Sequence, residues 1–462
     1  MLRKIRIAAA AFFFVLTTLL FLDFTGTLHA WFGWMAKIQF LPALLALNVG
    51  VVAFLVILTL LFGRVYCSVI CPLGVMQDIV SWASGKRRKH RNRFAYSPAL
   101  TWLRRGMLVV FVAAMLAGVG SLLAPYSAYG RIASNLLAPV YAWGNNLLAY
   151  IAGRMDSYAF YSVDVWMKSL STLLVAVVTF AVLFVLAWRS GRTYCNTICP
   201  VGTVLGFLAR YSLFKPRFDT SKCNGCKLCA RNCKASCIDP AAHKIDYSRC
   251  VACMDCLENC RQGAITYTLR RRKPDPAPAP QRPAADAAKT PSDASRRRFL
   301  GLAGIVAYSA LRAQEKKVDG GLAVIVDKKI PNRATPVVPP GAQSLRHFNA
   351  HCTGCQLCVS VCPNQVLRPS GKLMTLMQPE MSFERGYCRP ECTKCAEVCP
   401  TGAIRLTDLA GKSSIQIGHA VWIAENCEVN TDGVSCNNCA RHCHSGTYRR
   451  NLLLCLPGLC RR

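Results

Sequence analysis

Long apolar runs, separated by short polar stretches, dominate the first half of the chain. Four of them, over residues 5–22, 40–62, 107–124 and 169–188, are long enough, or nearly so, to cross a hydrocarbon core as helices. Lys and Arg gather before the first run and between the second and third, and they are few in the other connections. Because positive residues favour the cytoplasmic side, the pattern predicts a four-helix transmembrane domain over 1–217 with both ends in the cytoplasm.

A short repeat marks the ends of the second and fourth apolar runs. GRVYCSVICPLG at 63–74 matches GRTYCNTICPVG at 191–202, so each copy carries a C-x3-C-P turn. A duplicated two-helix unit places both turns on the same membrane face. One interpretation is a helix-ending turn with buried cysteines; the other is that the thiols meet and serve in electron transfer or bind a further cluster. The cysteines are Cys67, Cys71, Cys195 and Cys199.

Regularly spaced cysteines follow the fourth run. CNGCKLCARNC and CVACMDCLENC are each C-x2-C-x2-C-x3-C, the run that holds [4Fe–4S] clusters in bacterial-type ferredoxins, where the fourth cysteine ligates the cluster of the other run. Zinc is the alternative, but zinc sites present separated C-x2-C pairs. We predict a two-cluster ferredoxin domain over 218–268. The expected ligands are Cys223, Cys226, Cys229 and Cys260 for the first cluster and Cys250, Cys253, Cys256 and Cys233 for the second.

A stretch rich in Pro, Ala and charge occupies 269–345, where we expect an extended linker. Within it, residues 295–313 contain the S-R-R-x-F-L core of a twin-arginine export signal, followed by an apolar run too short to span a membrane comfortably. A chance basic patch before a short amphipathic helix is the alternative. Export through this signal would carry a folded, cluster-loaded domain to the outer face.

Three further cysteine groups lie over 346–443, the expected second polyferredoxin domain. They are Cys352, Cys355, Cys358 and Cys362; Cys388, Cys392, Cys395 and Cys399; and Cys427, Cys436, Cys439 and Cys443. Pro363 and Pro400 follow the first two groups, as in the ferredoxin run. Since such runs pair, three groups leave one without a partner. The tail at 444–462 departs from the expected continuation, so we expect that truncation or a frame shift has removed a fourth run.

The composition of the chain and the absence of several motifs exclude some classes of function. The mean hydropathy of +0.27, with 53% hydrophobic residues, is unusual for a soluble protein. A net charge of +33 invites a nucleic-acid function, which the position of the basic residues beside apolar runs and the lack of a binding motif disfavour. The four runs contain no His and the chain no C-x-x-C-H, so we expect no haem; without a dinucleotide fingerprint we expect no NAD.

A membrane quinol is therefore the expected source of electrons. Tyr126, Tyr129 and Arg131, near the outer end of the third run, are candidates for its site, with ordinary interfacial anchoring as the alternative. No general acid, base or nucleophile for another reaction is evident. The chain is expected to be an electron-transfer component of a quinol dehydrogenase, and whether it is itself an enzyme stays open.

These motifs resemble two known families. Residues 1–268, with four spans, two C-x3-C-P turns and the double cluster run, resemble the NapH/MauN-type membrane ferredoxins. Residues 295–443, with the export core and successive cluster runs, are similar to the NapG/MauM-type polyferredoxins, as though the two were fused. The resemblance implies a multi-pass protein of the bacterial cytoplasmic membrane that oxidises quinol and relays electrons through [4Fe–4S] clusters to a periplasmic reductase. It also implies a cytoplasmic first ferredoxin and a periplasmic second one.

The polyferredoxin resemblance further implies ligand sets for the second domain, although that family has four runs and this chain has three. The sets are Cys388, Cys392, Cys395 and Cys443; Cys427, Cys436, Cys439 and Cys399; and, for a fifth or incomplete cluster, Cys352, Cys355, Cys358 and Cys362. Two other functions stay open. One is an electron donor for maturation of a partner redox enzyme, as the methylamine-utilisation resemblance suggests, and the other is a membrane redox sensor or regulator.

Overall fold

The computed structural model describes residues 1–86, 94–117, 122–157, 159–165, 168–269, 335–372, 375–383 and 386–415, with 417, 429, 433 and 435. The chain divides into two compact units, 1–415 and 416–462, and the first is described here. The expected export segment at 295–313, the cysteines from Cys427 onward and the tail at 444–462 lie outside the described residues.

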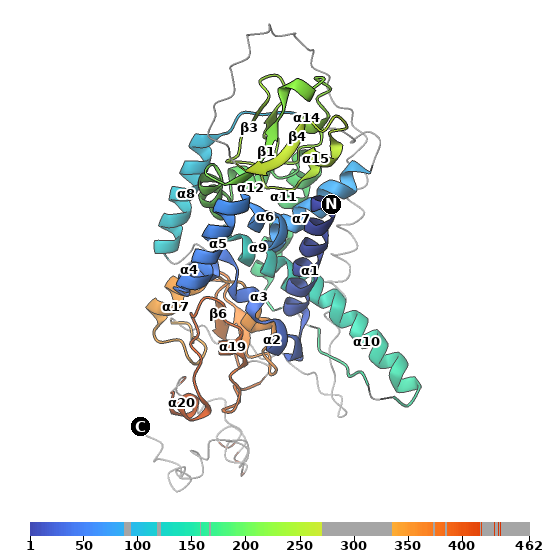
Figure 1. Ribbon diagram of the computed structural model, residues 1–462. Coiled ribbons are helices and arrows are strands. Elements are labelled where there is room, and N and C mark those ends of the chain that lie inside the picture. Colours follow the sequence, from blue (N-terminus) through green and yellow to red (C-terminus); the bar gives the residue numbers. More distant parts are fainter. Residues whose placement is uncertain are drawn as a thin grey trace. The chain divides into compact units, whose positions relative to one another are not determined.

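Helices make up the N-terminal part, as the apolar runs predict (Figure 1). Their bounds are α1 (Leu2–Leu22), α2 (Thr27–Phe32), α3 (Trp34–Lys37), α4 (Phe40–Leu45), α5 (Val49–Phe62), α6 (Val65–Val69), α7 (Pro72–Gly85), α8 (Thr101–Leu116), α9 (Pro125–Ile132), the π-helical turn η3 (Ala133–Leu137), α10 (Ala138–Arg154), α11 (Leu170–Ser190), α12 (Thr193–Thr197) and α13 (Pro200–Ala209). Within the described residues, α1 and α11, with 21 residues each, are long and apolar enough to cross a membrane. Since α5 and α8 have 14 and 16 residues, the four-span arrangement stays a prediction.

Two features of the bundle differ from the predicted runs. The run at 40–62 is broken, because α4 ends at Leu45 and α5 begins only at Val49. Between them Leu47 takes a left-handed φ of 53°, and the side chain of Asn48 caps α5 by accepting from the N–H of Val51 at 3.2 Å. The connection expected over 125–168 contains α9, η3 and the 17-residue α10.

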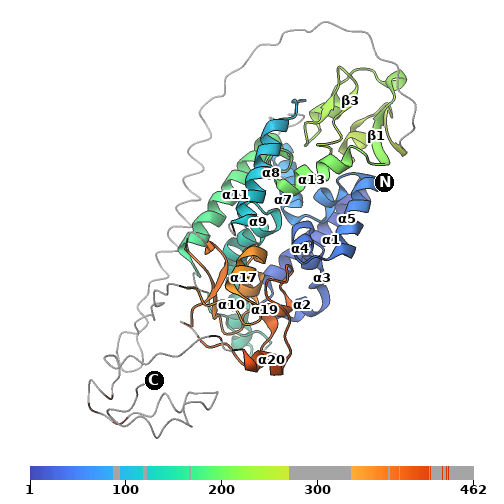
Figure 2. The same cartoon turned by 90° about the vertical axis from the view of Figure 1, so that its left-hand side faces the viewer.

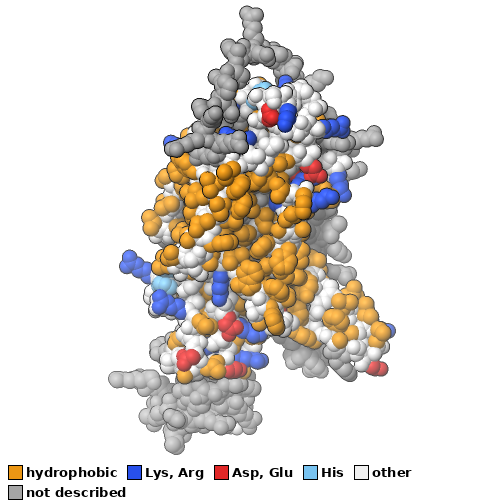
Figure 3. Space-filling model, in the orientation of Figure 1, with side chains coloured by type: hydrophobic (Ala, Val, Ile, Leu, Met, Phe, Trp, Pro, Cys, Tyr) orange, Lys and Arg blue, Asp and Glu red, His pale blue; other side chains and the backbone are white. Residues whose placement is uncertain are grey.

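Each of the four long apolar helices exposes large hydrophobic side chains. Phe12 of α1, Phe54 of α5, Val109 of α8 and Val178 of α11 are all more than half exposed. Figure 3 shows hydrophobic side chains gathered over the helices, with charged side chains towards the two ends. A contiguous apolar surface of this kind is typical of a protein part that contacts lipid.

The first ferredoxin domain is a small α+β unit built around the first pair of cysteine runs. It comprises β1 (Phe214–Phe218), the 3-10 turn η4 (Thr220–Lys222), α14 (Leu228–Arg231), β2 (Ile238–Asp239), β3 (Lys244–Ile245), α15 (Asp255–Asn259) and β4 (Ile265–Leu269). β1 pairs antiparallel with β4, with Phe214 opposite Leu269, and β2 pairs antiparallel with β3. Each of the two short helices begins inside a cysteine run, so the two strand pairs and the helices surround the cysteines.

The second ferredoxin domain has the same kind of frame. Its described elements are α17 (Leu345–His351), α18 (Leu357–Ser360), β5 (Leu367–Pro369), β6 (Pro379–Met381), α19 (Lys394–Glu397) and α20 (Leu409–Ser414). Figures 1 and 2 show the two ferredoxin domains at opposite ends of the helices. Tyr267 of the first domain donates to the carbonyl of Phe62 at 2.9 Å, and Asn135 at the other end donates to Gln356 at 3.0 Å.

Candidate iron–sulfur and electron-transfer sites

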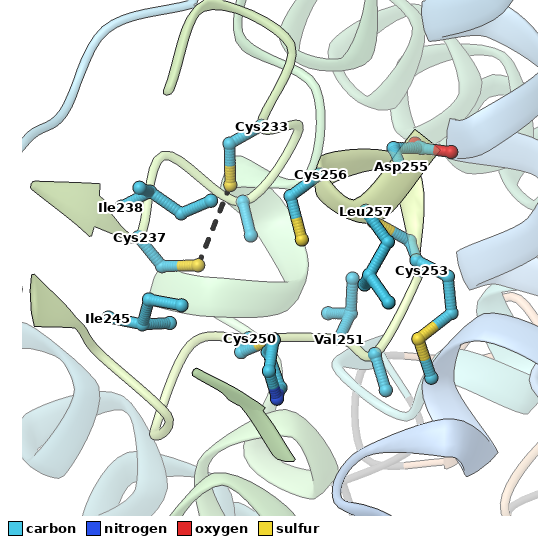
Figure 4. A pocket seen from close by; sticks show the side chains of 14 residues that line it. Cys233, Cys237, Ile238, Ile245, Cys250, Val251, Cys253, Asp255, Cys256 and Leu257 are labelled. Atoms are coloured by element: carbon cyan, nitrogen blue, oxygen red, sulfur yellow. Dashed lines mark hydrogen bonds between the residues drawn. The ribbon is translucent and has the colours of Figure 1, made fainter. Parts of the chain in front are cut away.

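Two cysteine-lined cavities occupy the first ferredoxin domain, each with about 410–420 Å³ of space that no protein atom fills, including the solvent at its opening. The cysteines that line the first are Cys223, Cys226, Cys229 and Cys260. Those that line the second are Cys233, Cys237, Cys250, Cys253 and Cys256 (Figure 4). Each cavity thus receives its fourth expected ligand from the other run. Four thiols around an apolar space fit the donor set of a [4Fe–4S] cluster.

The cysteine loops share a backbone conformation that wraps them around these cavities. In three runs the residues directly before and after the second cysteine have positive φ. They are Gly225 and Lys227, Ala252 and Met254, and Gly354 and Gln356, with φ between 50° and 71°. Successive left-handed residues turn backbone N–H groups towards one concavity, where an anionic group is favoured. This is why Gly recurs in C-x-G-C.

Cys237 is a cavity residue that the motif analysis missed. Its Sγ lies 3.5 Å from that of Cys233, and Figure 4 shows both sulfurs directed into the same space. The hydrogen bond from Cys237 lowers the pKa of Cys233 to about 7, while its bonds to Cys233 and Cys250 raise the pKa of Cys237 itself. A protonated thiol that donates to ligand sulfurs is one way in which a protein adjusts cluster potential. The sequence does contain a signal for this residue. When the two runs are aligned on their fourth cysteines, Cys233 and Cys260, Cys237 stands where the second run has Ala264 in CRQGAI.

The second ferredoxin domain also contains a cysteine-lined cavity, with about 330 Å³ of unfilled space. Its lining cysteines are Cys352, Cys355, Cys358 and Cys399. A second group is recognisable from its electrostatics: burial, together with the nearby thiols Cys388, Cys362 and Cys392, raises the pKa of Cys395 to about 12. The two runs therefore exchange their fourth cysteines, Cys362 and Cys399.

This grouping differs from the ligand sets that the resemblance implied. Cys399 was expected with Cys427, Cys436 and Cys439, and Cys362 in a fifth or incomplete cluster. The physical reason is that adjacent runs fold together, whereas the expected pairing linked the second run to the third. The expected partners Cys427, Cys436, Cys439 and Cys443 lie outside the described residues.

The two C-x3-C-P turns bring four more cysteines to one buried place within the helices. Cys67 and Cys71 flank the junction of α6 and α7, Cys195 and Cys199 that of α12 and α13, and all four are 4–5% exposed. Burial raises the pKa of Cys199, and the charges of the three other thiols raise it further, which shows their mutual proximity. In each turn Pro is the first helical residue, where its missing N–H costs nothing.

Two buried arginines connect the turns reciprocally. Arg64, which precedes the first turn, donates to the carbonyl of Cys195 at 3.1 Å. Arg192, which precedes the second, donates to the carbonyl of Cys67 at 2.6 Å. Both arginines are fully buried. Each guanidinium also lies against the glycine that follows the C-P of the opposite turn: Arg64 against Gly202, and Arg192 against Gly74. The sequence pattern G-R-x-Y-C-x3-C-P-x-G therefore describes one half of a structure that the two copies of the repeat form together.

The quinol candidates on α9 lie buried and not at an interface with lipid. Tyr126, Tyr129 and Arg131 are at most 2% exposed. Tyr129 and Thr18 of α1 share a hydrogen bond of 2.5 Å, whereas the buried hydroxyl of Tyr126 has no partner among the described residues. At Gly130 an added Cβ would lie 2.5 Å from the carbonyl oxygen of Cys355, so α9 packs directly against the second ferredoxin.

Two protein-family profiles match the chain. One, described as a 4Fe-4S binding domain, matches residues 44–90 and 172–221. The other, described as a 4Fe-4S dicluster domain, matches residues 351–403. The first includes both C-x3-C-P turns, and the second spans the two runs that the structure pairs.

Three curated relatives match different parts of the chain. An uncharacterized protein of Methanocaldococcus jannaschii is 25% identical over 214 residues, 46% of this chain and 68% of that protein. The methylamine utilization ferredoxin-type protein MauM of Methylophilus methylotrophus is 32% identical over 131 residues, 26% of this chain and 54% of MauM. The ferredoxin-type protein NapH of Escherichia coli is 29% identical over 195 residues, 42% of this chain and 55% of NapH. No solved structure matches significantly.

The cysteine-lined cavities and these matches define the class of protein. The chain is a ferredoxin-type iron–sulfur electron-transfer protein. More particularly, its N-terminal part is similar to NapH and MauN and its C-terminal part to MauM, as in a fusion of the two kinds of ferredoxin, so the resemblance predicted from its motifs is confirmed.

Proposed function

We propose that the chain is a membrane-embedded electron-transfer protein that takes electrons from quinol and delivers them to a redox partner, a periplasmic reductase, at the outer face. The observation that carries the proposal is the contact between α9 and the second ferredoxin, where Gly130 lies against the carbonyl of Cys355. The buried Tyr126 hydroxyl, which has no partner among the described residues, lies within electrostatic reach of Cys355 and Cys399, two of the cysteines that line the cavity of the second ferredoxin. A quinol hydroxyl is a chemically suitable partner for that oxygen.

The chemistry divides between the cofactors and the protein. Oxidation of one quinol releases two electrons and two protons, and the clusters, when bound, supply one-electron steps. The chain's own residues would orient the quinol: the Tyr126 hydroxyl would hydrogen-bond to it, and the positive charge of Arg131 would stabilise the negative charge that develops as the quinol loses its two protons to the solvent outside. The apolar surface of α1, α5, α8 and α11 supports placement in a bilayer.

The charge distribution supports an orientation. Arg3 on α1 pairs with Asp255 of the first ferredoxin at 2.8 Å, and Arg104 of α8 donates to Ser248 of the same domain at 3.1 Å. The basic ends of the helices therefore meet the first ferredoxin, which we place in the cytoplasm. The second ferredoxin, at the opposite end, would lie outside.

Reduction by quinol is the decisive assay. Purified, cluster-loaded protein in liposomes is mixed anaerobically with reduced quinol, and cluster reduction is followed by visible absorbance and EPR. We expect reduction that depends on quinol. If quinol never reduces the clusters while a cytoplasmic electron donor does, the quinol function is wrong.

Placement of the second ferredoxin has its own test. A reporter fused after residue 345 should be active outside the membrane in an export-competent cell. Changing Arg296→Lys together with Arg297→Lys should abolish that activity, because the twin-arginine pair is what the export machinery reads. Unchanged reporter location in the double variant would argue against export by this segment.

The name of one relative favours a second candidate function. MauM is described as a methylamine utilization protein, and it matches 26% of this chain. We propose as the alternative that the chain supplies electrons for maturation of a partner redox enzyme. Neighbouring genes discriminate the two: a reductase operon favours respiration, and an amine dehydrogenase operon favours maturation.

A further inference from the structure

We propose that Cys67, Cys71, Cys195 and Cys199 together hold an iron–sulfur centre inside the helical bundle, and that this centre connects the two ferredoxin domains electronically. The inference extends the proposed electron-transfer function, but it does not depend on quinol being the electron donor. Each of the two proposals can therefore be wrong while the other is right.

The donor set suits such a centre. Two thiols come from each copy of the repeat, all four are nearly inaccessible, and N–H groups already point at three of the sulfurs. Gln77 donates to the sulfur of Cys195 at 3.3 Å, the backbone of Gly202 to Cys199 at 3.4 Å, and Arg64 to Cys67 at 3.8 Å. Ligand sulfurs of iron–sulfur centres are anionic and are stabilised by such donors.

The charge of Arg64 is the second argument. Arg192 has a carboxylate partner, Asp78, at 2.8 Å, but the residue at the matching place in the second repeat is Gly206. Among the described residues, Arg64 accordingly donates only to neutral oxygens and to the sulfur of Cys67. A fully buried guanidinium without a counter-charge is costly. Four thiolates around an iron–sulfur core carry a net negative charge that offsets it.

The matched family profile is the third argument. The segments 44–90 and 172–221, described as a 4Fe-4S binding domain, contain four cysteines in this sequence. These are the cysteines of the two turns, because the ligands of the first ferredoxin begin only at Cys223. A cluster held by the matched segments must therefore use the buried thiols.

The site lies between the two ferredoxin domains. Towards the first domain, the Arg64 guanidinium donates to the sulfur of Cys67 and also to the carbonyl of Arg249 at 3.5 Å, next to the expected cluster ligand Cys250. Towards the second domain, Tyr194 beside Cys195 donates to the carbonyl of Leu123 at 3.4 Å, close to the start of α9, and α9 reaches Cys355. One electron enters and one leaves such a centre, and no bond to the protein forms or breaks.

The test compares the full-length, cluster-loaded protein with the double variant Cys67→Ser plus Cys195→Ser, which removes one thiol from each turn. Cys455→Ser plus Cys460→Ser is the matched control, because it also removes two thiols and neither belongs to a cysteine run. We expect iron and acid-labile sulfide to fall by about four atoms each per chain in the double variant if the centre is [4Fe–4S], or by about two if it is [2Fe–2S], and to stay constant in the control.

A second readout follows electrons across the bilayer. Proteoliposomes with the second ferredoxin outward receive dithionite outside and contain ferricyanide inside. The wild type should reduce the enclosed ferricyanide, and the double variant should fall to the rate of empty vesicles while the EPR signals of the ferredoxin domains persist. Because dithionite replaces quinol as the donor, the result does not depend on quinol oxidation.

Unchanged iron content in the double variant would overturn the proposal. So would a Cys67–Cys71 or Cys195–Cys199 disulfide found by alkylation and mass spectrometry of the anaerobically isolated wild type. If the double variant fails to insert, Cys199→Ser alone is used, since a serine oxygen can keep the place of the ligand. We then expect one EPR signal to shift, and an unaltered set of signals counts against the centre.

Discussion

Arg192 binds both carboxylate oxygens of Asp78, with Nε 2.9 Å from Oδ1 and Nη2 2.8 Å from Oδ2. Arg6 of α1 reaches the same carboxylate at 3.0 Å, and Lys234 of the first ferredoxin lies 3.6 Å from it. A single buried acid therefore joins α1, α7, the second C-x3-C-P turn and the first ferredoxin domain.

Substitution Asp78→Asn is expected to destabilise the protein by about 3–5 kcal/mol, because it leaves Arg192 buried without a counter-charge. Denaturant unfolding in detergent, followed by loss of cluster absorbance, measures the effect. Asp219→Asn is the control, since Asp219 pairs with Lys222 at the surface, 3.5 Å away, and should show no measurable change. Similar effects of the two substitutions would contradict the role of Asp78.

The pH dependence of this contribution has a definite sign. Burial favours the neutral carboxyl, but Arg192 and Lys234 outweigh it and hold the pKa of Asp78 well below its ordinary value. A depressed pKa in the folded state stabilises the protein above the unfolded value of about 3.9, and this contribution is lost as the pH falls further. The stability difference between wild type and Asp78→Asn should be constant from about pH 5 to 8 and shrink only below about pH 4. If the stability difference between the two proteins already changed between pH 6 and 8, the pKa of Asp78 would not be depressed in the folded state.

The pairing of the second ferredoxin predicts which cluster each cysteine serves. Cys399→Ser should remove the cluster of Cys352, Cys355 and Cys358, and Cys362→Ser that of Cys388, Cys392 and Cys395, each with about four iron atoms. Iron analysis and EPR measure the losses. Cys443→Ser distinguishes the two ligand sets, because we expect this variant to keep both clusters. If it lost the cluster at Cys388, Cys443 would be a ligand there, as the resemblance implied, and the pairing proposed here would be wrong.

Gly130→Ala should weaken the contact between α9 and the second ferredoxin. The new methyl group would lie 2.5 Å from the carbonyl oxygen of Cys355 and 2.8 Å from the ring of Phe21, which costs about 1–3 kcal/mol. We expect slower reduction of the second ferredoxin by quinol in stopped-flow experiments. Gly144→Ala on α10 meets no atom within 4 Å and should leave the rate unchanged or add up to about 1 kcal/mol of stability.

Tyr126→Phe tests the proposed quinol contact. If the unpartnered hydroxyl binds quinol, its removal should raise the KM for quinol about tenfold, the loss of one hydrogen bond of about 1.5 kcal/mol. Tyr129→Phe instead breaks the bond to Thr18 and should lower stability by about 1 kcal/mol. An unchanged KM in Tyr126→Phe would show that this hydroxyl does not contact the substrate.

The spacing of the cysteines in the sequence predicted much of the arrangement of the candidate cluster sites. The run at 223–260 predicted which thiols lie together, because each loop and its following helix are local, and the expected thiols line the same two cavities. In the second domain the run begins Cys388-x3-Cys392 and not C-x2-C, and a third group offered a competing partner, so spacing alone led to another pairing. Cys237 was overlooked because it stands outside the four-cysteine run.

Long-range packing accounts for what the sequence could not supply. The repeat predicted that the two turns share a membrane face, but the exchange of Arg64 and Arg192 depends on contacts more than a hundred residues apart. Likewise, Tyr126 and Arg131 have the composition of an interfacial stretch, and they are buried because α9 packs against α7, α11 and Phe21 of α1 as well as against the second ferredoxin.

The two copies of the repeat depend on each other in the way that the subunits of a dimer do, because the arginine of each copy binds the turn of the other. Since each turn is completed by a side chain from the other, a single two-helix unit would leave its carbonyl and its guanidinium unsatisfied until it met a second copy. The two copies are not equivalent, however. One has an acid, Asp78, for its arginine, and the other has Gly206 at the matching place, packed against the carbonyl of Ser248 in the first ferredoxin.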